Sequence, residues 1–346
     1  MVDPDELVRL SRRLEQLYAD VEVSLLRYIA KRLARGLGDD DWAVKRLGEA
    51  GVVRSRARRI VSSLQRERDK EIVRMVVAAH AAGAESAART TGIAATIATV
   101  DSEAASRALV HALSGNLSQA DLRILRSADD IYRRVIANVT ARGLADEFTR
   151  RAAAQAALDM FADTGITGFT DMAGRNWSLT SYAEMACRTA VNSAARQGVF
   201  DELRADGRDL VIVSGSPSCC EMCAPWEGEV LSLDGMTSGY PTLGEAEADG
   251  LFHPNCSHTA DPYIEGLTKR GTTQRGDPER YAARQEQRYL ERGLRQWKMR
   301  EAVALDDAAA ARAAAKVSEW ESRLRQHITA NDLKRLPYRE RIGEAI

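Results

Sequence analysis

The chain has 346 residues, of which 45% are hydrophobic and 5% aromatic, and its formal net charge is −1. This length allows at least one sizeable core, and two domains are a reasonable expectation. The near-neutral charge excludes the strong overall positive field that marks many nucleic-acid-binding proteins. Abundant alanine with few aromatic residues favours long helices that pack through small side chains.

The N-terminal half of the sequence predicts a series of helices. Asp3-Pro4 is typical of a helix start, and apolar residues then recur at helical spacing. Gly36 is expected to end this helix, and one of Asp39 to Asp41 to cap the next. Gly115-Asn116 and Gly143 are expected to interrupt the helices that follow. The predicted helices after the first lie at 41–50, 54–82, 84–98, 101–114, 117–142 and 144–163.

Basic residues are unevenly distributed along these helices. The stretch from Arg54 to Arg74 carries eight basic and three acidic residues, and the sequence from Lys269 onward is also basic in balance. On long helices such residues more often form solvated faces with i,i+4 ion pairs than a DNA-binding surface. We therefore favour solvated faces.

The sequence shows no membrane or export signal. No apolar run approaches the roughly 20 residues that cross a bilayer. The acidic N-terminus lacks the basic start and apolar core of a signal peptide. We expect the protein to be made and kept in a reducing cytoplasm, where cysteines remain thiols or bind metal.

The pattern changes at Gly165. Ile166–Thr170 predicts a short strand, a helix is expected from about Ser178 to Ala205, and Leu210–Val213 is the strongest β segment. Further strands are expected at 229–233 and 259–264, on either side of one or two helical turns at 243–249, and helices return after about 276. The predicted fold class is α+β and mostly helical: a helical arm (1–164), a small central α+β domain (165–266) and a helical tail (267–346).

Four of the five cysteines and two of the five histidines fall in one window of the central domain. Cys220 and Cys223 have Cys-x2-Cys spacing, and His253 and Cys256 also lie three apart, with His258 two residues beyond. Thiolate and imidazole are the ligands that zinc prefers, and two such pairs can close a tetrahedral site. The predicted cofactor is therefore a structural zinc ion.

The ligand set remains open at this point. The favoured set is Cys220, Cys223, Cys256 and either His253 or His258, against the alternative of buried free cysteines beside a satisfied core histidine. Cys219 and Cys187 are more simply read as buried thiols, and Glu221 and Glu227 have no recognisable general-base context. The sequence has no His-Glu-x-x-His, and no His-x-Glu with Pro-Cys-x-x-Cys, so a closed structural site is preferred to a catalytic one.

Three blocks of the central domain resemble the minor head proteins of tailed bacteriophages, the Mu F-like family of minor capsid proteins. They are the helix Trp177–Met185 continuing to Arg188-Thr189, the segment Cys220–Val230, and the ending Gly250–His258. Ser257 and His258 stand where arginine and often cysteine occur in that family. Together the blocks cover roughly 165–265.

This resemblance implies a virion protein without enzymatic activity, located in the head interior or at the portal vertex and in the host cytoplasm during assembly. Its implied partners are the portal protein, the major capsid protein and packaged DNA, and its implied role is in head assembly or DNA ejection. The main alternative is a metal-dependent nuclease of the His-Asn-His type that uses His253 or His258 as base, although no acidic partner precedes His253 at the required spacing. A third class is a prophage-encoded scaffold or toxin-linked domain.

Overall fold

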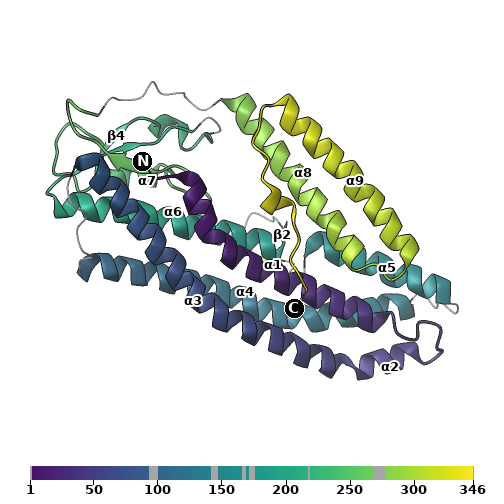
Figure 1. Ribbon diagram of the computed structural model, residues 1–346. Coiled ribbons are helices and arrows are strands. Elements are labelled where there is room, and N and C mark those ends of the chain that lie inside the picture. The colour runs from purple at the N-terminus through teal and green to yellow at the C-terminus, as the bar shows by residue number, and fades with distance from the viewer. Residues whose placement is uncertain are drawn as a thin grey trace. The chain divides into compact units, whose positions relative to one another are not determined.

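Figure 1 shows the computed structural model, which describes residues 2–92, 100–141, 147–165, 169–170, 176–216, 219–268 and 277–345. Most of these residues are helical, with a small sheet, which confirms the predicted fold class. No helix in these ranges is both long and apolar enough to cross a membrane. The helices are α1 (Pro4–Leu33), α2 (Trp42–Gly48), α3 (Ala50–Thr91), α4 (Val100–Ala141), α5 (Glu147–Thr164), α6 (Leu179–Ala205), α7 (Leu243–Ala248), α8 (Pro278–Ala302) and α9 (Asp307–Ala330). The strands are β1 (Phe169–Thr170), β2 (Asn176–Trp177), β3 (Leu210–Val213), β4 (Val230–Ser232) and β5 (Ala260–Pro262).

The chain divides into two compact units, each assembled from segments that are distant in sequence. One unit contains Met1–Leu14, Asp69–Asn116 and Glu184–Arg284, and the other contains Glu15–Arg68, Leu117–Ala183 and Gln285–Ile346. The division into arm, central domain and tail that the sequence suggested stays a prediction.

The first unit contains a three-stranded antiparallel sheet with the strand order β4-β3-β5. β3 is the central strand: Val211 lies opposite Leu231 on one side and Pro262 on the other. The β-branched run of β3 suits this position, because a central strand has a neighbouring strand at each edge against which its side chains pack. Its last residue, Val213, pairs with Ala260 at the start of β5, so the loops leaving β3 and entering β5 meet at the same end of the sheet.

In the same unit, α3 and α6 approach each other closely through glycine. A Cβ atom at Gly198 would lie 2.0 Å from the carbonyl oxygen of His80, and one at Gly83 would lie 1.9 Å from that of Ala195. A hydrogen bond of 2.8 Å between His80 Nε2 and Asp201 Oδ2 lies next to this contact. Only glycine permits so close an approach of two helix backbones.

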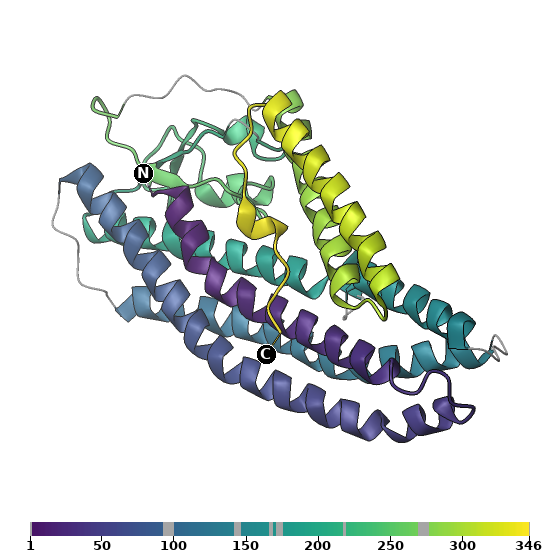
Figure 2. The same cartoon turned by 45° about the vertical axis from the view of Figure 1, so that its right-hand side comes forward.

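In the described part of the second unit, the regular structure is helical apart from the short β1–β2 pair. Its α8 and α9 run side by side (Figure 2), and buried Leu290, Leu294 and Leu324 form a core between them. Elsewhere in this unit the fully buried Asp121 forms an ion pair with Arg68 and accepts a hydrogen bond from Tyr18 Oη at 3.2 Å. A buried charge is tolerated only when it is paired in this way.

Several predicted boundaries agree with the structure. Asp3 Oδ1 accepts from the backbone N–H of Asp5 at 2.9 Å at the start of α1, and Ser178 Oγ accepts from that of Ser181 at 3.2 Å at the start of α6. The strand predicted at 210–213 is β3 itself. Asp41 does stand at the N-cap of α2, but its side chain makes no capping hydrogen bond.

The predicted interruptions of the long helices are wrong. α3 runs through Gly83 and α4 through Gly115-Asn116, so four expected helices are two of 42 residues each. An isolated glycine costs a helix only about 1 kcal/mol relative to alanine, which tertiary packing readily offsets. The predicted stop at Gly143 and most of the predicted strand at 166–170 lie outside the described residues.

Candidate metal centre

Two short turns of similar form meet at the end of the three-stranded sheet. In the first, which follows β3, the backbone N–H of Cys223 donates to the carbonyl oxygen of Cys220 at 3.2 Å. In the second, which precedes β5, the N–H of Cys256 donates to the carbonyl oxygen of His253 at 2.9 Å. Asn255 occupies the left-handed region with φ 70°. Asparagine tolerates that conformation better than most residues, which explains its place in the turn.

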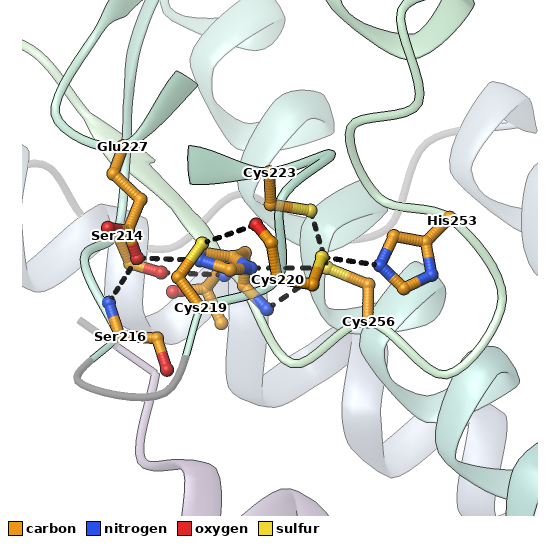
Figure 3. Close-up of polar contacts among 10 residues, drawn as sticks. Ser214, Ser216, Cys219, Cys220, Cys223, Glu227, His253 and Cys256 are labelled. Carbon is orange, nitrogen blue, oxygen red and sulfur yellow. Dashed lines mark hydrogen bonds and ion pairs between the residues drawn. The ribbon is translucent and has the colours of Figure 1, made fainter. Parts of the chain in front are cut away.

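The side chains of the two turns point toward one another (Figure 3). His253 Nε2 lies 3.1 Å from Cys220 Sγ, and the sulfurs of Cys223 and Cys256 are 3.7 Å apart. Among the described residues, Cys220, Cys223 and His253 form one group of closely spaced ligand atoms, and Cys223, Cys256 and His258 form a second. The structure thus brings together all five residues that the sequence predicted as ligands.

His258 connects this cluster to a buried carboxylate. Its Nδ1 lies 3.3 Å from Cys256 Sγ, and its Nε2 lies 2.9 Å from Glu227 Oε1. The same Glu227 oxygen accepts from the backbone N–H of Ser216. His258 and Glu227 are each only 3% exposed, so the pair belongs to the interior of the site.

Cys219 and Cys187 have different surroundings from the other cysteines. Cys219 is buried and its thiol donates to the carbonyl oxygen of Cys220 at 3.3 Å. It also lies near Glu227 and His258, which form a third group of potential ligands with it. Cys187 is fully buried in α6 and belongs to the core, as the sequence indicated.

One face of α6 holds the second turn through hydrogen bonds. Arg188 Nη1 donates to Asn255 Oδ1, and Thr189 Oγ1 accepts from the backbone N–H of Asn255 at 2.9 Å. Asn192 Nδ2 donates to the carbonyl oxygen of Cys256 at 2.6 Å. Helical spacing brings these side chains to the same face, so α6 fixes the backbone of the turn independently of any ion.

Burial and mutual contact strongly shift the pKa values of the cluster. The hydrogen bond with Cys223 lowers the pKa of Cys256 to about 4, and the same bond raises the pKa of Cys223 well above its ordinary value. Burial would lower the pKa of His258, but its hydrogen bonds with Cys256 and Glu227 raise it overall. Burial raises the pKa of the Cys219 thiol. The cluster therefore favours a thiolate at Cys256 and an intact thiol at Cys219.

Such a donor set suits a soft or borderline divalent ion. Buried thiolate and imidazole groups of this kind could hold a metal, and tetrahedral sulfur–nitrogen sites are typical of zinc. The nuclease alternative gains no support, because His258 is buried with both ring nitrogens engaged and the ring of His253 faces Cys220.

The sequence interpretation missed Glu227 and the polar face of α6. Glu227 lies 31 positions from His258, and Asn192 lies 64 positions from Cys256. The available signal was the spacing of Arg188, Asn192 and Arg196, which places a polar residue at every helical turn.

Comparisons with known proteins cover most of the chain. A family model described as phage minor capsid protein 2 matches residues 2–329. A structural protein of Lactococcus phage LL-H is 27% identical over 190 residues, 51% of this chain and 51% of that protein, so the chain spans about half of that relative's length. A structural protein of Lactococcus phage mv4 is 32% identical over 116 residues, 30% of this chain and 93% of that protein. No solved structure matches the chain.

Proposed function

The chain belongs to the phage minor capsid protein 2 family, and from this premise we propose that it acts at the portal vertex or on the inner surface of the phage head. The observation that carries the proposal is the family match, which extends over residues 2–329 and so covers most of both compact units. The chain is thus a structural component of the virion, and its proposed role is in head assembly, DNA ejection or both.

The fold supports a role in assembly. α3 and α4 contain 42 residues each, about 63 Å of helix at 1.5 Å per residue, which offers extended surface to partner proteins. The near-neutral net charge suits a protein that lies beside packaged DNA without binding it tightly. The proposed partners are the portal protein, the major capsid protein and, more weakly, DNA.

We further propose that residues 165–266 form a Mu F-like module, with the flanking segments 1–164 and 267–346 as helical arm and tail. The described part of this module contains the three-stranded sheet, α6 and the cysteine–histidine turns. Three sequence blocks carry this proposal, whereas the family model that matches the chain is that of phage minor capsid protein 2.

Chemical cross-linking of procapsids and mature virions, followed by mass spectrometry, tests the location. We expect cross-links from lysines of this protein to the portal protein in procapsids. A phage with an amber mutation in this gene should produce heads that are defective in assembly or in DNA delivery. If the protein is absent from both procapsids and virions, and the amber mutant produces normal particles, the proposal is refuted.

A further inference from the structure

We propose that Cys220, Cys223, His253 and Cys256 bind one zinc ion, and that His258 is not a ligand but positions the Cys256 sulfur. The predicted ligand set left His253 and His258 as alternatives, and the form of the two turns favours His253. This inference is independent of the proposed location in the phage head, because it concerns only the packing of the chain itself.

The backbone favours His253 as the fourth ligand. Cys220–Cys223 and His253–Cys256 are matched four-residue turns, each closed by a hydrogen bond from its fourth N–H to its first carbonyl oxygen. Each turn presents its first and fourth side chains to the same centre, as zinc-binding turns do. His258 lies outside the second turn, two residues after its end.

The ring of His253 has the orientation of a metal ligand. Its Nδ1 lies 2.8 Å from the carbonyl oxygen of Pro254. Because a carbonyl oxygen only accepts hydrogen bonds, Nδ1 carries the ring proton. The lone pair is then on Nε2, the atom that faces Cys220 Sγ at 3.1 Å. A backbone carbonyl that fixes the tautomer in this way is the usual support of a metal-bound histidine.

His258 is engaged on both sides of its ring. Nε2 faces Glu227 Oε1 at 2.9 Å, and Nδ1 faces Cys256 Sγ at 3.3 Å. The backbone N–H of His258 also donates to this sulfur at 3.4 Å. The ring and the backbone N–H of His258 thus hold the Cys256 sulfur in place while Glu227 holds the far side of the ring, so His258 acts through Cys256.

Two of the distances between ligand atoms suit a single small ion, whereas Cys256 is grouped with Cys223 but not with Cys220 or His253 and must move closer to them as the ion binds. Two sulfurs at about 2.3 Å from a tetrahedral zinc lie about 3.8 Å apart, and sulfur and nitrogen ligands about 3.5 Å apart. The distance between the sulfurs of Cys223 and Cys256 is 3.7 Å. The 3.1 Å between Cys220 and His253 requires an outward shift of only a few tenths of an ångström, within reach of side-chain rotation.

A buried arginine supplies the matching charge. Arg196 is 7% exposed, packs over the ring of Phe252 at 4.1 Å, and donates to the carbonyl oxygen of His258 at 3.4 Å. Within the described ranges no salt bridge joins it to a carboxylate, and the charges that act on it are those of Cys256, Glu247 and Cys223. Zinc with three thiolates and one imidazole carries a net charge of −1, which balances this cation. A buried cation without such a counter-charge is costly.

The whole 346-residue chain, purified with zinc in the medium, should contain about one equivalent of zinc by elemental analysis. The zinc content should fall below about half an equivalent in each of the variants Cys220→Ser, Cys223→Ser and Cys256→Ser. The matched control is Cys219→Ser, which replaces the neighbouring buried thiol and should retain the zinc. A zinc-free wild type, or loss of zinc from the Cys219→Ser protein alone, would overturn the proposal.

A pair of cysteine substitutions distinguishes the two histidines even if alanine variants fail to fold. After exchange with Co²⁺, His253→Cys should keep the ion and raise the thiolate-to-cobalt charge-transfer intensity by about one third, from three thiolates to four. His258→Cys should keep the wild-type number of thiolate ligands and bind the ion about 10–100-fold more weakly in a chelator competition. The reverse pattern, with the fourth thiolate gained in the His258→Cys protein, would assign His258 as the ligand and refute the proposal.

Discussion

The contact between α3 and α6 leads to a prediction opposite in sign to the usual effect of replacing glycine in a helix. Gly198 is buried within α6, and alanine is intrinsically better than glycine in a helix by about 0.8–1 kcal/mol. At this position, however, the added methyl group would lie 2.0 Å from the carbonyl oxygen of His80. Contacts of a Cβ atom below 3.0 Å are essentially never observed, so the helices must separate by about 1 Å locally.

The cost of this separation exceeds the gain in helix propensity. Overpacking of an interior costs about 1–3 kcal/mol, and the upper part of this range applies because the obstacle is backbone and cannot rotate away. We therefore expect Gly198→Ala to lower the free energy of unfolding by about 2 kcal/mol after the propensity gain is included. The shift also stretches the hydrogen bond between His80 and Asp201, which lies beside the contact.

Urea denaturation followed by circular dichroism measures the change. The matched control is Gly115→Ala in α4, an exposed helical glycine with no atom within 4 Å of the new Cβ. This substitution should raise the denaturation midpoint and increase the free energy of unfolding by up to about 1 kcal/mol. If Gly198→Ala is as stable as wild type while Gly115→Ala is more stable, the close approach of α3 and α6 is wrong.

Three further predictions concern other polar contacts. Asp121→Asn should lower the free energy of unfolding by about 3–5 kcal/mol, because it removes the charge that pairs with the buried Arg68 guanidinium, and a loss below 1 kcal/mol in denaturant titrations would contradict the buried pair. Asp209→Asn should lower the free energy of unfolding by about 1.5–3 kcal/mol. Burial alone would raise the pKa of Asp209, but hydrogen bonds from Ser232, Asp234 and Thr237 lower it below the ordinary value of 3.8. The stabilisation from Asp209 is therefore present above pH 3.8 and is lost as the pH falls through the lower folded value, so the difference between wild type and variant measured by thermal melts should shrink in acid. Thr242→Ala removes the capping box with Glu245 at the start of α7 and should cost about 1 kcal/mol in denaturant titrations, whereas a neutral result would indicate that α7 is held by other contacts.

The sequence predicted those features that depend on neighbouring residues. The β-branched run of Leu210–Val213, the helix starts near Asp3 and Ser178, and the two closely spaced ligand pairs are all local signals, and each is present in the structure. The meeting of the two pairs could be expected only from the chemistry of their side chains, because 33 residues separate Cys223 from Cys256.

The features that sequence reasoning missed depend on contacts between distant segments. Gly83 and Gly115 look alike as potential helix breaks, yet one lies against the backbone of α6 and the other is exposed. Glu227 had no recognisable role until the fold placed His258 beside it. Local patterns specify which conformation a segment adopts, whereas the partner of a buried polar group is determined by topology.

The architecture of the first unit explains why its site relies on polar contacts. Strands of three, four and three residues cannot enclose a core of their own, so the loops around them need additional support. α6 supplies part of it, since Asn192 and Thr189 fix the backbone of the second turn from outside. The proposed zinc ion would connect this turn to Cys220 and Cys223 at the end of β3 and so link β3 to β5 beyond the last ladder hydrogen bond. Removal of zinc should therefore loosen the two turns first and leave the glycine contact between α3 and α6 intact, an order of events that amide hydrogen exchange with and without chelator can resolve.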